Sequence, residues 1–162
     1  MKPSFLVVIA ALALLTVPAL PRAQAGTDFS GRWKISQAKS SPGAIGNNAK
    51  VTFPSELIVE QRPGELHVDM RIPRTDSVTA VYKLDGSEIT VGTPAGIAEK
   101  AKAMWDGNKL VITARRVVTS PFGDFVTDTK EVWTRTGNVL TIGKTVTAEG
   151  IADTETAVFD KD

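Results

Sequence analysis

The chain has 162 residues, no cysteine and a single histidine, so it forms no disulfide and has no thiol for catalysis. Lys2 and Arg22 are the only charged residues before residue 26, and the remainder holds 17 basic and 18 acidic residues. This balance gives no basic excess for a nucleic-acid backbone, so we expect no nucleic-acid partner. The length suits one domain with one core.

Residues 1–25 have the pattern of a signal peptide. Lys2 precedes an uncharged apolar stretch over residues 5–15, and Ala23-Gln24-Ala25 is an A-x-A cleavage site. The stretch is shorter than the roughly 20 residues that a membrane-spanning helix needs. We therefore expect a periplasmic or secreted protein whose mature chain, residues 26–162, is one β-barrel domain without a transmembrane segment.

The first strand is expected over Phe29–Ser36, and a long loop over Gln37–Pro54 follows it. The loop holds Ser40-Ser41-Pro42-Gly43 and Gly46-Asn47-Asn48, and it has too little periodicity for a regular element. Irregular loops of this length are often lids or binding loops.

From Ser55 onward, apolar and polar residues alternate in runs that indicate strands. Tight turns are expected at 61–64, 85–86, 106–107 and 136–138, and longer loops at 73–76, 93–99, 119–124 and 147–153. In an up-and-down meander the two kinds of connection fall at opposite ends. The sequence therefore predicts an all-β, antiparallel barrel of about 8–10 strands, closed by its last strand, with tight turns at the base and long loops at the mouth.

Two registers follow from the pattern. Pairing Glu60 with Glu65 places the apolar residues of the first hairpin, Leu57, Val59, Leu66 and Val68, on one face. Pairing Val118 with Val126 sets Arg116 opposite Asp128. Arg116 then either forms an ion pair within the sheet or binds a carboxylate in the cavity, since a buried guanidinium needs a partner.

Little or no helix is expected. The one candidate segment is Ala95–Met104, whose alanines and lysines permit a helical turn, although Pro94 and Gly96 argue against a long one.

The tryptophans should lie near the base of the barrel. Trp105 and Trp133 each precede a tight turn, and Trp33 belongs to a strand that begins at that end. Packing of the barrel taper is the simplest role for them, because a tryptophan side chain buries roughly 200 Å².

The strands also carry a resemblance to known proteins. Gly31-Arg32-Trp33 resembles the Gly-x-Trp motif of the lipocalins, and the chain is similar over residues 26–162 to small exported bacterial proteins of lipocalin-like type. The resemblance implies a calycin-type barrel with Gly31, Trp33, Trp105 and Trp133 at its base, in a group without an assigned activity. Lipocalins usually place an arginine near the chain end over the motif tryptophan, whereas Arg135 is the last arginine here.

Little in the sequence supports a metal, a cofactor or catalysis. His67 is the only histidine, no further His or Cys could complete a metal site, and no Gly-x-Ser-x-Gly motif is present. We expect no metal and no cofactor, and an enzyme is the least favoured class, although paired carboxylates brought together by the barrel stay open.

Apolar residues gather in the loops and strand ends of the expected mouth, where they would form a small-molecule site. The candidate ligand-binding residues are Phe53, Met70, Ile97, Arg116, Phe122 and Phe125.

Three functions remain. The leading hypothesis is an exported protein that holds a small apolar or amphipathic molecule in the barrel. The second is an envelope interaction protein whose barrel is filled by its own side chains, with Phe122 and Ile151 contacting another protein. The third is an enzyme on a calycin-like barrel, with carboxylates or arginines that converge inside the cavity and have strongly perturbed pKa values.

Overall fold

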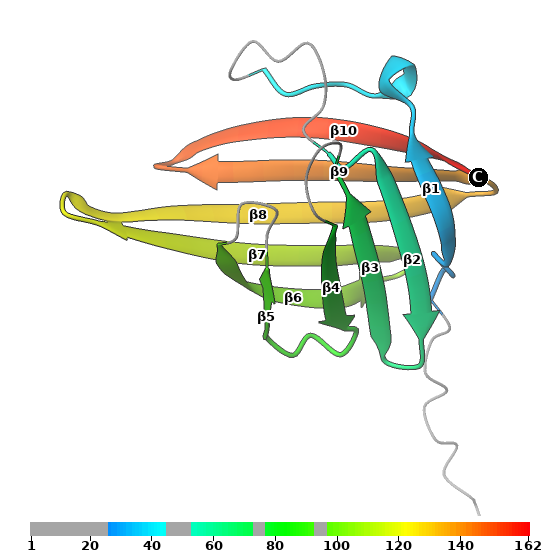
Figure 1. The fold of residues 1–162 in the computed structure, drawn as a ribbon, viewed down its shortest axis with the longest axis horizontal. Helices are drawn as coiled ribbons and strands as arrows, with labels where there is room; N and C mark the ends of the chain where they lie inside the picture. Colours follow the sequence, from blue (N-terminus) through cyan, green and yellow to red (C-terminus); the bar gives the residue numbers. More distant parts are fainter. Residues whose placement is uncertain (1–25, 45–52, 73–76, 93–96) are drawn as a thin grey trace, which may run out of the picture.

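The computed structural model describes residues 26–44, 53–72, 77–92 and 97–162 (Figure 1). The expected signal peptide, the expected loop at 73–76 and parts of the expected loops at 37–54 and 93–99 lie outside these residues.

Ten antiparallel strands form the described structure. They are β1 (Gly31–Ile35), β2 (Glu56–Arg62), β3 (Glu65–Arg71), β4 (Val78–Lys83), β5 (Ile89–Gly92), β6 (Ala98–Asp106), β7 (Lys109–Ser120), β8 (Gly123–Thr136), β9 (Val139–Ala148) and β10 (Ile151–Lys161). Their order in the sheet is β4-β3-β2-β1-β10-β9-β8-β7-β6-β5. This order confirms the predicted all-β, up-and-down barrel, in which the last strand pairs with the first.

The barrel is nearly closed, and complete closure was a wrong expectation. Strands β4 and β5 stand at the two ends of the sheet order. The segment between them turns away from β4: Asp85 forms a bridge with Met104 of β6, and Gly86 donates its N–H to Ala103 O at 3.0 Å. Strand β5 has only four residues, and no backbone ladder joins it to β4, which leaves a gap in the hydrogen bonding of the barrel between these two edges.

The β2–β3 hairpin shows how the alternating pattern determines the interior face. Leu57, Val59, Leu66 and Val68 are all buried, as predicted. The expected register was wrong by two residues, because Arg62 pairs with Glu65 and Glu60 with His67 around a two-residue turn. A shift of two keeps every side chain on its face, and Gly64, at φ 79°, permits the tighter turn.

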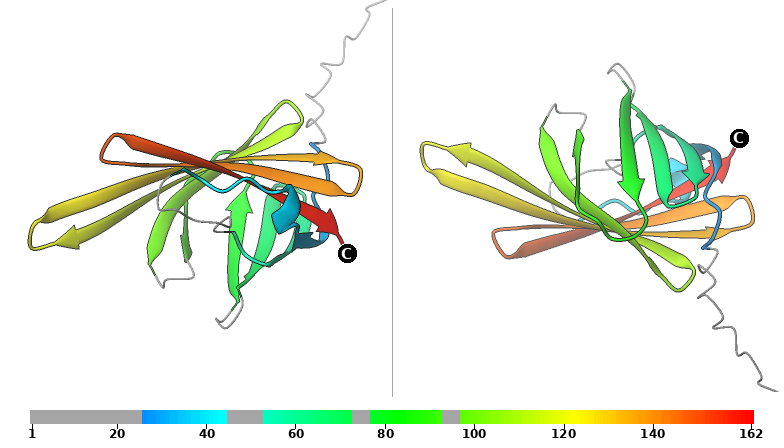
Figure 2. Two further views of the ribbon diagram at one scale, coloured as in Figure 1. Left: turned by 90° about the horizontal axis from the view of Figure 1, so that it is seen from above. Right: turned by 90° about the horizontal axis from the view of Figure 1, so that it is seen from below.

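Strands β7 to β10 are long and run across β1 to β4 (Figure 1). Seen from above and below, the β7–β8 and β9–β10 hairpins project past the other strands (Figure 2). The longer loops predicted at 119–124 and 147–153 were wrong: the ladders continue to Ser120–Gly123 and to Ala148–Ile151. The β-branched residues there pair instead of looping, and Gly123 and Gly150 supply the positive φ that such turns require.

The outer part of the β7–β8 hairpin is an apolar ribbon, residues 117–126. Strand β6 pairs with β7 as far as Arg115, and β9 pairs with β8 from Thr127 onward, so these two strands have only each other within the described chain. Five of its apolar side chains are exposed: Val117, Val118, Phe122, Phe125 and Val126.

The main core fills the base of the barrel. Phe29 and Trp33 have no exposed surface, and Trp133 is 3 % exposed. Phe29 stacks on Trp105 with ring centroids 5.9 Å apart and meets Trp133 edge to face. The Trp33 indole donates to Phe29 O at 2.9 Å, so its polar atom is satisfied inside the core.

Almost no helix is present, as predicted. The single short helix of the described chain is the 3₁₀ turn η1 (Gln37–Lys39). The candidate helical segment was wrong from Ala98 onward, since β6 begins there. Ala101 and Ala103 are buried on the interior face of β6, where their small side chains fit among the larger side chains of the core.

The first part of the long loop lies along β10. Ser41 exchanges two backbone hydrogen bonds of 2.8 Å with Thr156, and Ser36 donates its N–H to Val158 O at 2.8 Å. These contacts satisfy β10 backbone groups beyond the short β1–β10 ladder.

Candidate functional site

A cavity of about 430 Å³ lies inside the barrel above the packed base. Its size falls within the range of roughly 300–1,000 Å³ that is usual for small-molecule sites. The residues that line it are Phe53, Pro54, Met70, Ile72, Tyr82, Val91, Gly92, Glu99, Arg116, Thr127, Thr129, Glu131, Lys144 and Val146. Because Tyr82 of β4 and Val91 of β5 are among them, the cavity borders the gap between the sheet edges.

One side of the cavity is apolar. Met70 and Ile72 come from β3 and its end, and Phe53 lies just before β2. Phe53 is fixed by an edge-to-face contact with Phe159, ring centroids 6.1 Å apart, and by the Lys144 ammonium 4.3 Å from its ring centroid. This side could contact the hydrocarbon part of a ligand.

Arg116 faces the cavity from β7. Its NH1 lies 3.8 Å from Glu99 Oε1 of β6, a separation at the long end for an ion pair. The predicted β7–β8 register was wrong by one residue: Val118 pairs with Phe125, so Arg116 lies opposite Thr127. A slip of one exchanges the faces, and it is Arg115, on the outside, that binds Asp128 through bonds of 2.7 and 2.8 Å.

A second ion pair lies deeper in the barrel. Lys144 of β9 pairs with Glu155 of β10. Glu155 is the one charged residue among the buried residues of the described chain. Replacement of either partner would leave a charge in a poorly solvated place.

Glu131 is the third carboxyl group of the interior. It extends from β8 into the cavity, and its Oε2 accepts the indole N–H of Trp133 at 2.9 Å. Burial raises the pKa of Glu131, an effect only partly offset by the Trp133 hydrogen bond and the charge of Lys144. The charges of Glu99 and Glu155 raise it further.

Tyr82 completes the polar side. Burial raises the pKa of its phenol, and the nearby carboxylates of Glu131 and Glu99 add to the effect. The hydroxyl is therefore a neutral hydrogen-bonding group at any physiological pH.

The six candidate ligand residues lie in two places. Phe53, Met70 and Arg116 line the cavity. Ile97, immediately before β6, is not among the lining residues, and neither are Phe122 and Phe125, which belong to the apolar ribbon. Phe122 is 94 % exposed at the turn, so a ligand contact by these three stays a prediction from the sequence.

The four residues assigned to the base lie together there. Trp33 and Trp133 are in the core, and Trp105 packs against it. Gly31 has φ 145°, and a Cβ at this position would come within 2.7 Å of the Lys161 side chain. Arg135 and Lys161 place cations 5.6 and 5.4 Å from the Trp33 ring centroid. Arg135 of β8 therefore lies over the motif tryptophan, where the lipocalin resemblance implies an arginine from nearer the chain end.

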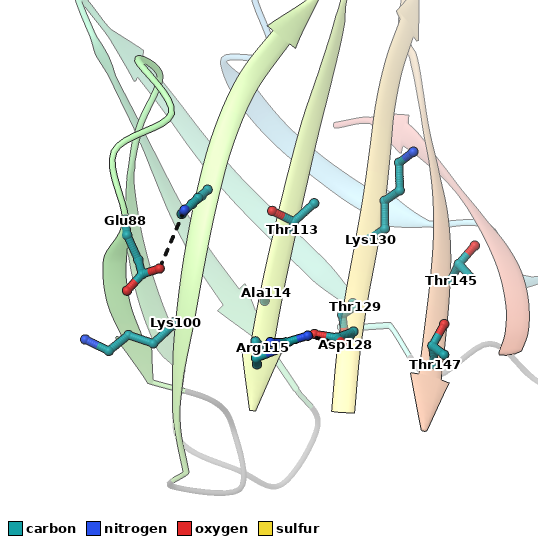
Figure 3. Close-up of a pocket in the computed structure, with 11 residues that line it drawn as sticks. Glu88, Lys100, Thr113, Ala114, Arg115, Asp128, Thr129, Lys130, Thr145 and Thr147 are labelled. Carbon is teal, nitrogen blue, oxygen red and sulfur yellow. Dashed lines mark hydrogen bonds and ion pairs between the residues drawn. The ribbon is translucent and has the colours of Figure 1, made fainter. Parts of the chain in front are cut away.

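A second hollow, of about 630 Å³, lies on the outer face of β6 to β9 (Figure 3). It is bordered by solvent-facing side chains such as Lys100, Lys130 and Thr147, and the exposed Arg115–Asp128 pair crosses it. Because its charged groups remain solvated, it offers little binding energy. The internal cavity is the better candidate site, although it is the smaller one.

Metal binding has no support in the described residues. His67 Nε2 lies 3.1 Å from Glu65 Oε2, and these residues contain no group of three or more His, Cys, Asp or Glu side chains that could hold an ion. Within the described chain no helix is long and apolar enough to span a membrane.

Sequence reasoning missed Glu131, Lys144 and Glu155 as interior residues. The signal was present in β9, where Leu140 and Ile142 are buried and Lys144 is the next residue on the same face. Extending the alternation by one step would have placed this lysine inside.

No family model matches the chain, and no curated protein matches its sequence. Solved structures with the same fold include the zebrafish ileal bile acid-binding protein in complex with cholic acid, at 16 % identity, covering 83 % of this chain and 98 % of that one with a TM-score of 0.60. Fatty-acid-binding protein 1 of Echinococcus granulosus, at 18 % identity, covers 82 % and 96 % with a TM-score of 0.53. Lipid binding protein 8 of Caenorhabditis elegans, at 13 % identity, covers 83 % and 95 % with a TM-score of 0.53. At these identities the likeness shows the fold, a nearly closed β-barrel of the fatty-acid-binding-protein and calycin-like type.

Proposed function

We propose that this chain is an exported binding protein that holds a small apolar or amphipathic molecule inside its barrel. The observation that supports it best is the internal cavity, whose apolar side faces a side of charged and hydroxyl groups. Such a lining suits a ligand with a hydrocarbon body and one polar group. Barrels of the same fold include proteins named for binding bile acids, fatty acids and other lipids.

The cavity makes the alternative of a filled barrel the weaker one. Phe53 and Met70 pack against the core from above, yet the space between them and Arg116 is not filled by side chains. The enzyme alternative expects carboxylates or arginines to converge in the cavity, and Glu99, Arg116 and Glu131 do line it, so catalysis is the second candidate function.

A matched pair of methionines tests binding. Met70 lines the cavity, whereas Met104 is on the outer side of β6 and 54 % exposed. Met70→Trp should fill the cavity and weaken binding of the neutral fluorophore N-phenyl-1-naphthylamine by about tenfold or more, and Met104→Trp should leave it unchanged. Equal affinity in both variants and the parent, with the fold intact, would overturn the proposal.

Phe122→Asp belongs in the same titration. Since Phe122 does not line the cavity, we expect unchanged fluorophore affinity. A clear loss would instead support the sequence-based prediction that the hairpin tip contacts the ligand.

Export rests on the sequence of residues 1–25 alone. Expression of the full chain with its own N-terminus, followed by mass measurement of the protein from the extracytoplasmic fraction, should give a chain that begins at Gly26. Retention of residues 1–25 in the cytoplasmic fraction would contradict this part of the proposal.

A further inference from the structure

We propose that the polar group of the bound molecule is a protonated aliphatic amine and that the carboxyl group of Glu131 receives it. This inference rests on the proposed function, because it names the class of ligand for the same cavity.

The position of Glu131 is the first argument. It faces the cavity from the middle of β8, and one of its two oxygens accepts the Trp133 N–H. No cation of the described residues lies within ion-pair distance of it: the cavity-facing cations nearest to it, Arg116 and Lys144, pair with Glu99 and Glu155. The second oxygen of Glu131, Oε1, accepts no hydrogen bond from the described residues. An enclosed oxygen without a partner is not found in the described chain, so Oε1 is accessible from the cavity.

The charge balance of the interior is the second argument. Three carboxyl groups face two cations, and each cation already has its own carboxylate. An incoming carboxylate would have to compete with Glu99 for Arg116 or with Glu155 for Lys144. An incoming ammonium finds a carboxyl group without an ionic partner, and pairing would offset the cost of burying both.

The groups around Glu131 come from five strands. The charges of Glu99 of β6 and Glu155 of β10 disfavour the ionised form of Glu131, whereas the charge of Lys144 of β9 favours it. Glu131 in turn raises the pKa of Tyr82 of β4. Arg116 of β7 pairs with Glu99. The raised pKa means that the empty barrel keeps a proton on Glu131 over a wider pH range than a solvated glutamate would.

At a pH low enough for Glu131 to hold its proton in the empty protein, binding exchanges one proton for one cation. The ammonium enters with its own proton, Glu131 ionises to pair with it, and the proton of Glu131 passes to the solvent. Amine affinity should therefore increase with pH until Glu131 is ionised in the empty protein. A neutral alcohol of equal chain length would bind without releasing a proton.

Isothermal titration with decylamine, decanol and decanoate, all below their micelle concentrations, tests the inference. In the parent protein we expect decylamine to bind about tenfold or more tightly than either of the others, because a charged hydrogen-bonded pair replaces a neutral contact. Repeating the decylamine titration in two buffers of different ionisation enthalpy, at a series of pH values from 5 upward, should reveal a released proton that disappears as Glu131 ionises in the empty protein.

Glu131→Gln should remove the amine preference and the proton release while decanol affinity changes little. Glu88→Gln is the matched control, since Glu88 is half exposed and pairs with Lys102 on the outer face. A preference for amine that persists in Glu131→Gln would overturn the assignment to this residue.

The result for decanoate separates the two proposals. Tightest binding of decanoate, lost in Arg116→Met, would overturn the amine inference and leave the proposed binding function standing. If none of the three probes binds the folded parent protein, the proposed function itself fails.

Discussion

Trp133 donates its indole N–H to Glu131 over 2.9 Å and so joins the packed base of the barrel to the wall of the cavity. The ring belongs to the core, where it meets Phe29 edge to face, while the carboxyl group belongs to the candidate site. A change of charge on Glu131 therefore acts on a rigid residue of the core. Trp133 fluorescence should report it.

The first prediction concerns stability against pH. Because its pKa is raised above the usual 4.5, folded Glu131 binds its proton more tightly than the unfolded chain does. This contribution is complete below pH 4.5 and is lost as the pH rises through the folded pKa, at about 1.4 kcal/mol for each unit of difference. Glu131→Gln should abolish this loss. The free energy of unfolding of the variant should therefore rise relative to that of the parent protein as the pH increases.

Urea unfolding from pH 5 to 9 measures the effect as the difference between the two curves. The carboxyl groups of Asp28, Glu60 and Asp128, whose pKa values are lowered, have the opposite effect but cancel in this difference. Parallel curves for parent and variant would show that burial does not raise the pKa of Glu131.

The second prediction compares adjacent arginines. Arg116→Met should lower the free energy of unfolding by roughly 1–3 kcal/mol, because Glu99 would lose its ionic partner in a partly buried place. Arg115→Met removes an exposed pair with Asp128 and should change stability very little. Thermal and urea unfolding of both variants provide the comparison. Equal losses would mean that Arg116 does not face the interior.

The third prediction compares two phenylalanines. Phe29 is fully buried between Trp105 and Trp133, so Phe29→Ala should cost about 3–5 kcal/mol. Phe122→Ala, at the exposed turn, should cost nothing measurable in urea unfolding. Similar stabilities of the two variants would show that the base is not the packed core of the barrel.

Much of the fold follows from the period-two pattern. The alternation fixed which face of β2 and β3 is buried even though the register was wrong by two residues, because a shift of two preserves the face. In β7 the error was one residue, and it exchanged the environments of Arg115 and Arg116 opposite Asp128. A register shift of an even number of residues leaves each side chain on its predicted face, and a shift of an odd number does not. The shift depends on the length of the turn, and the turn length depends on single residues with positive φ, such as Gly64.

The site was less predictable because it depends on strand length and on contacts across the barrel. The sequence placed a mouth at Phe122, but the ladder continues to Ser120 and carries this turn outward. Glu131 and Glu155 meet near Lys144 only because β8, β9 and β10 are neighbours in register. Such a cluster is visible in the sequence only after every register is known.

The fourth prediction concerns the turn between β9 and β10. Glu149 has φ 50° and precedes Gly150 at φ 78°, a conformation that asparagine and glycine adopt more easily than glutamate does. Glu149→Asn should stabilise the protein by about 0.5–1 kcal/mol, and Glu149→Ala should not. Urea unfolding of both variants checks it, and a gain of the same size for alanine would point to the loss of charge instead.

The fifth prediction concerns the apolar ribbon. Residues 117–126 expose apolar side chains on both faces, since Val117 pairs with Val126 on one side and Val118 with Phe125 on the other. Both outer edges have backbone groups without a sheet neighbour in the described chain, which favours strand pairing with a second copy. Sedimentation at increasing concentration should show self-association that Phe122→Lys and Val117→Lys reduce. Met104→Lys, which adds the same charge at an exposed methionine outside the ribbon, should not reduce it, and a parent protein that stays monomeric would contradict this role of the ribbon.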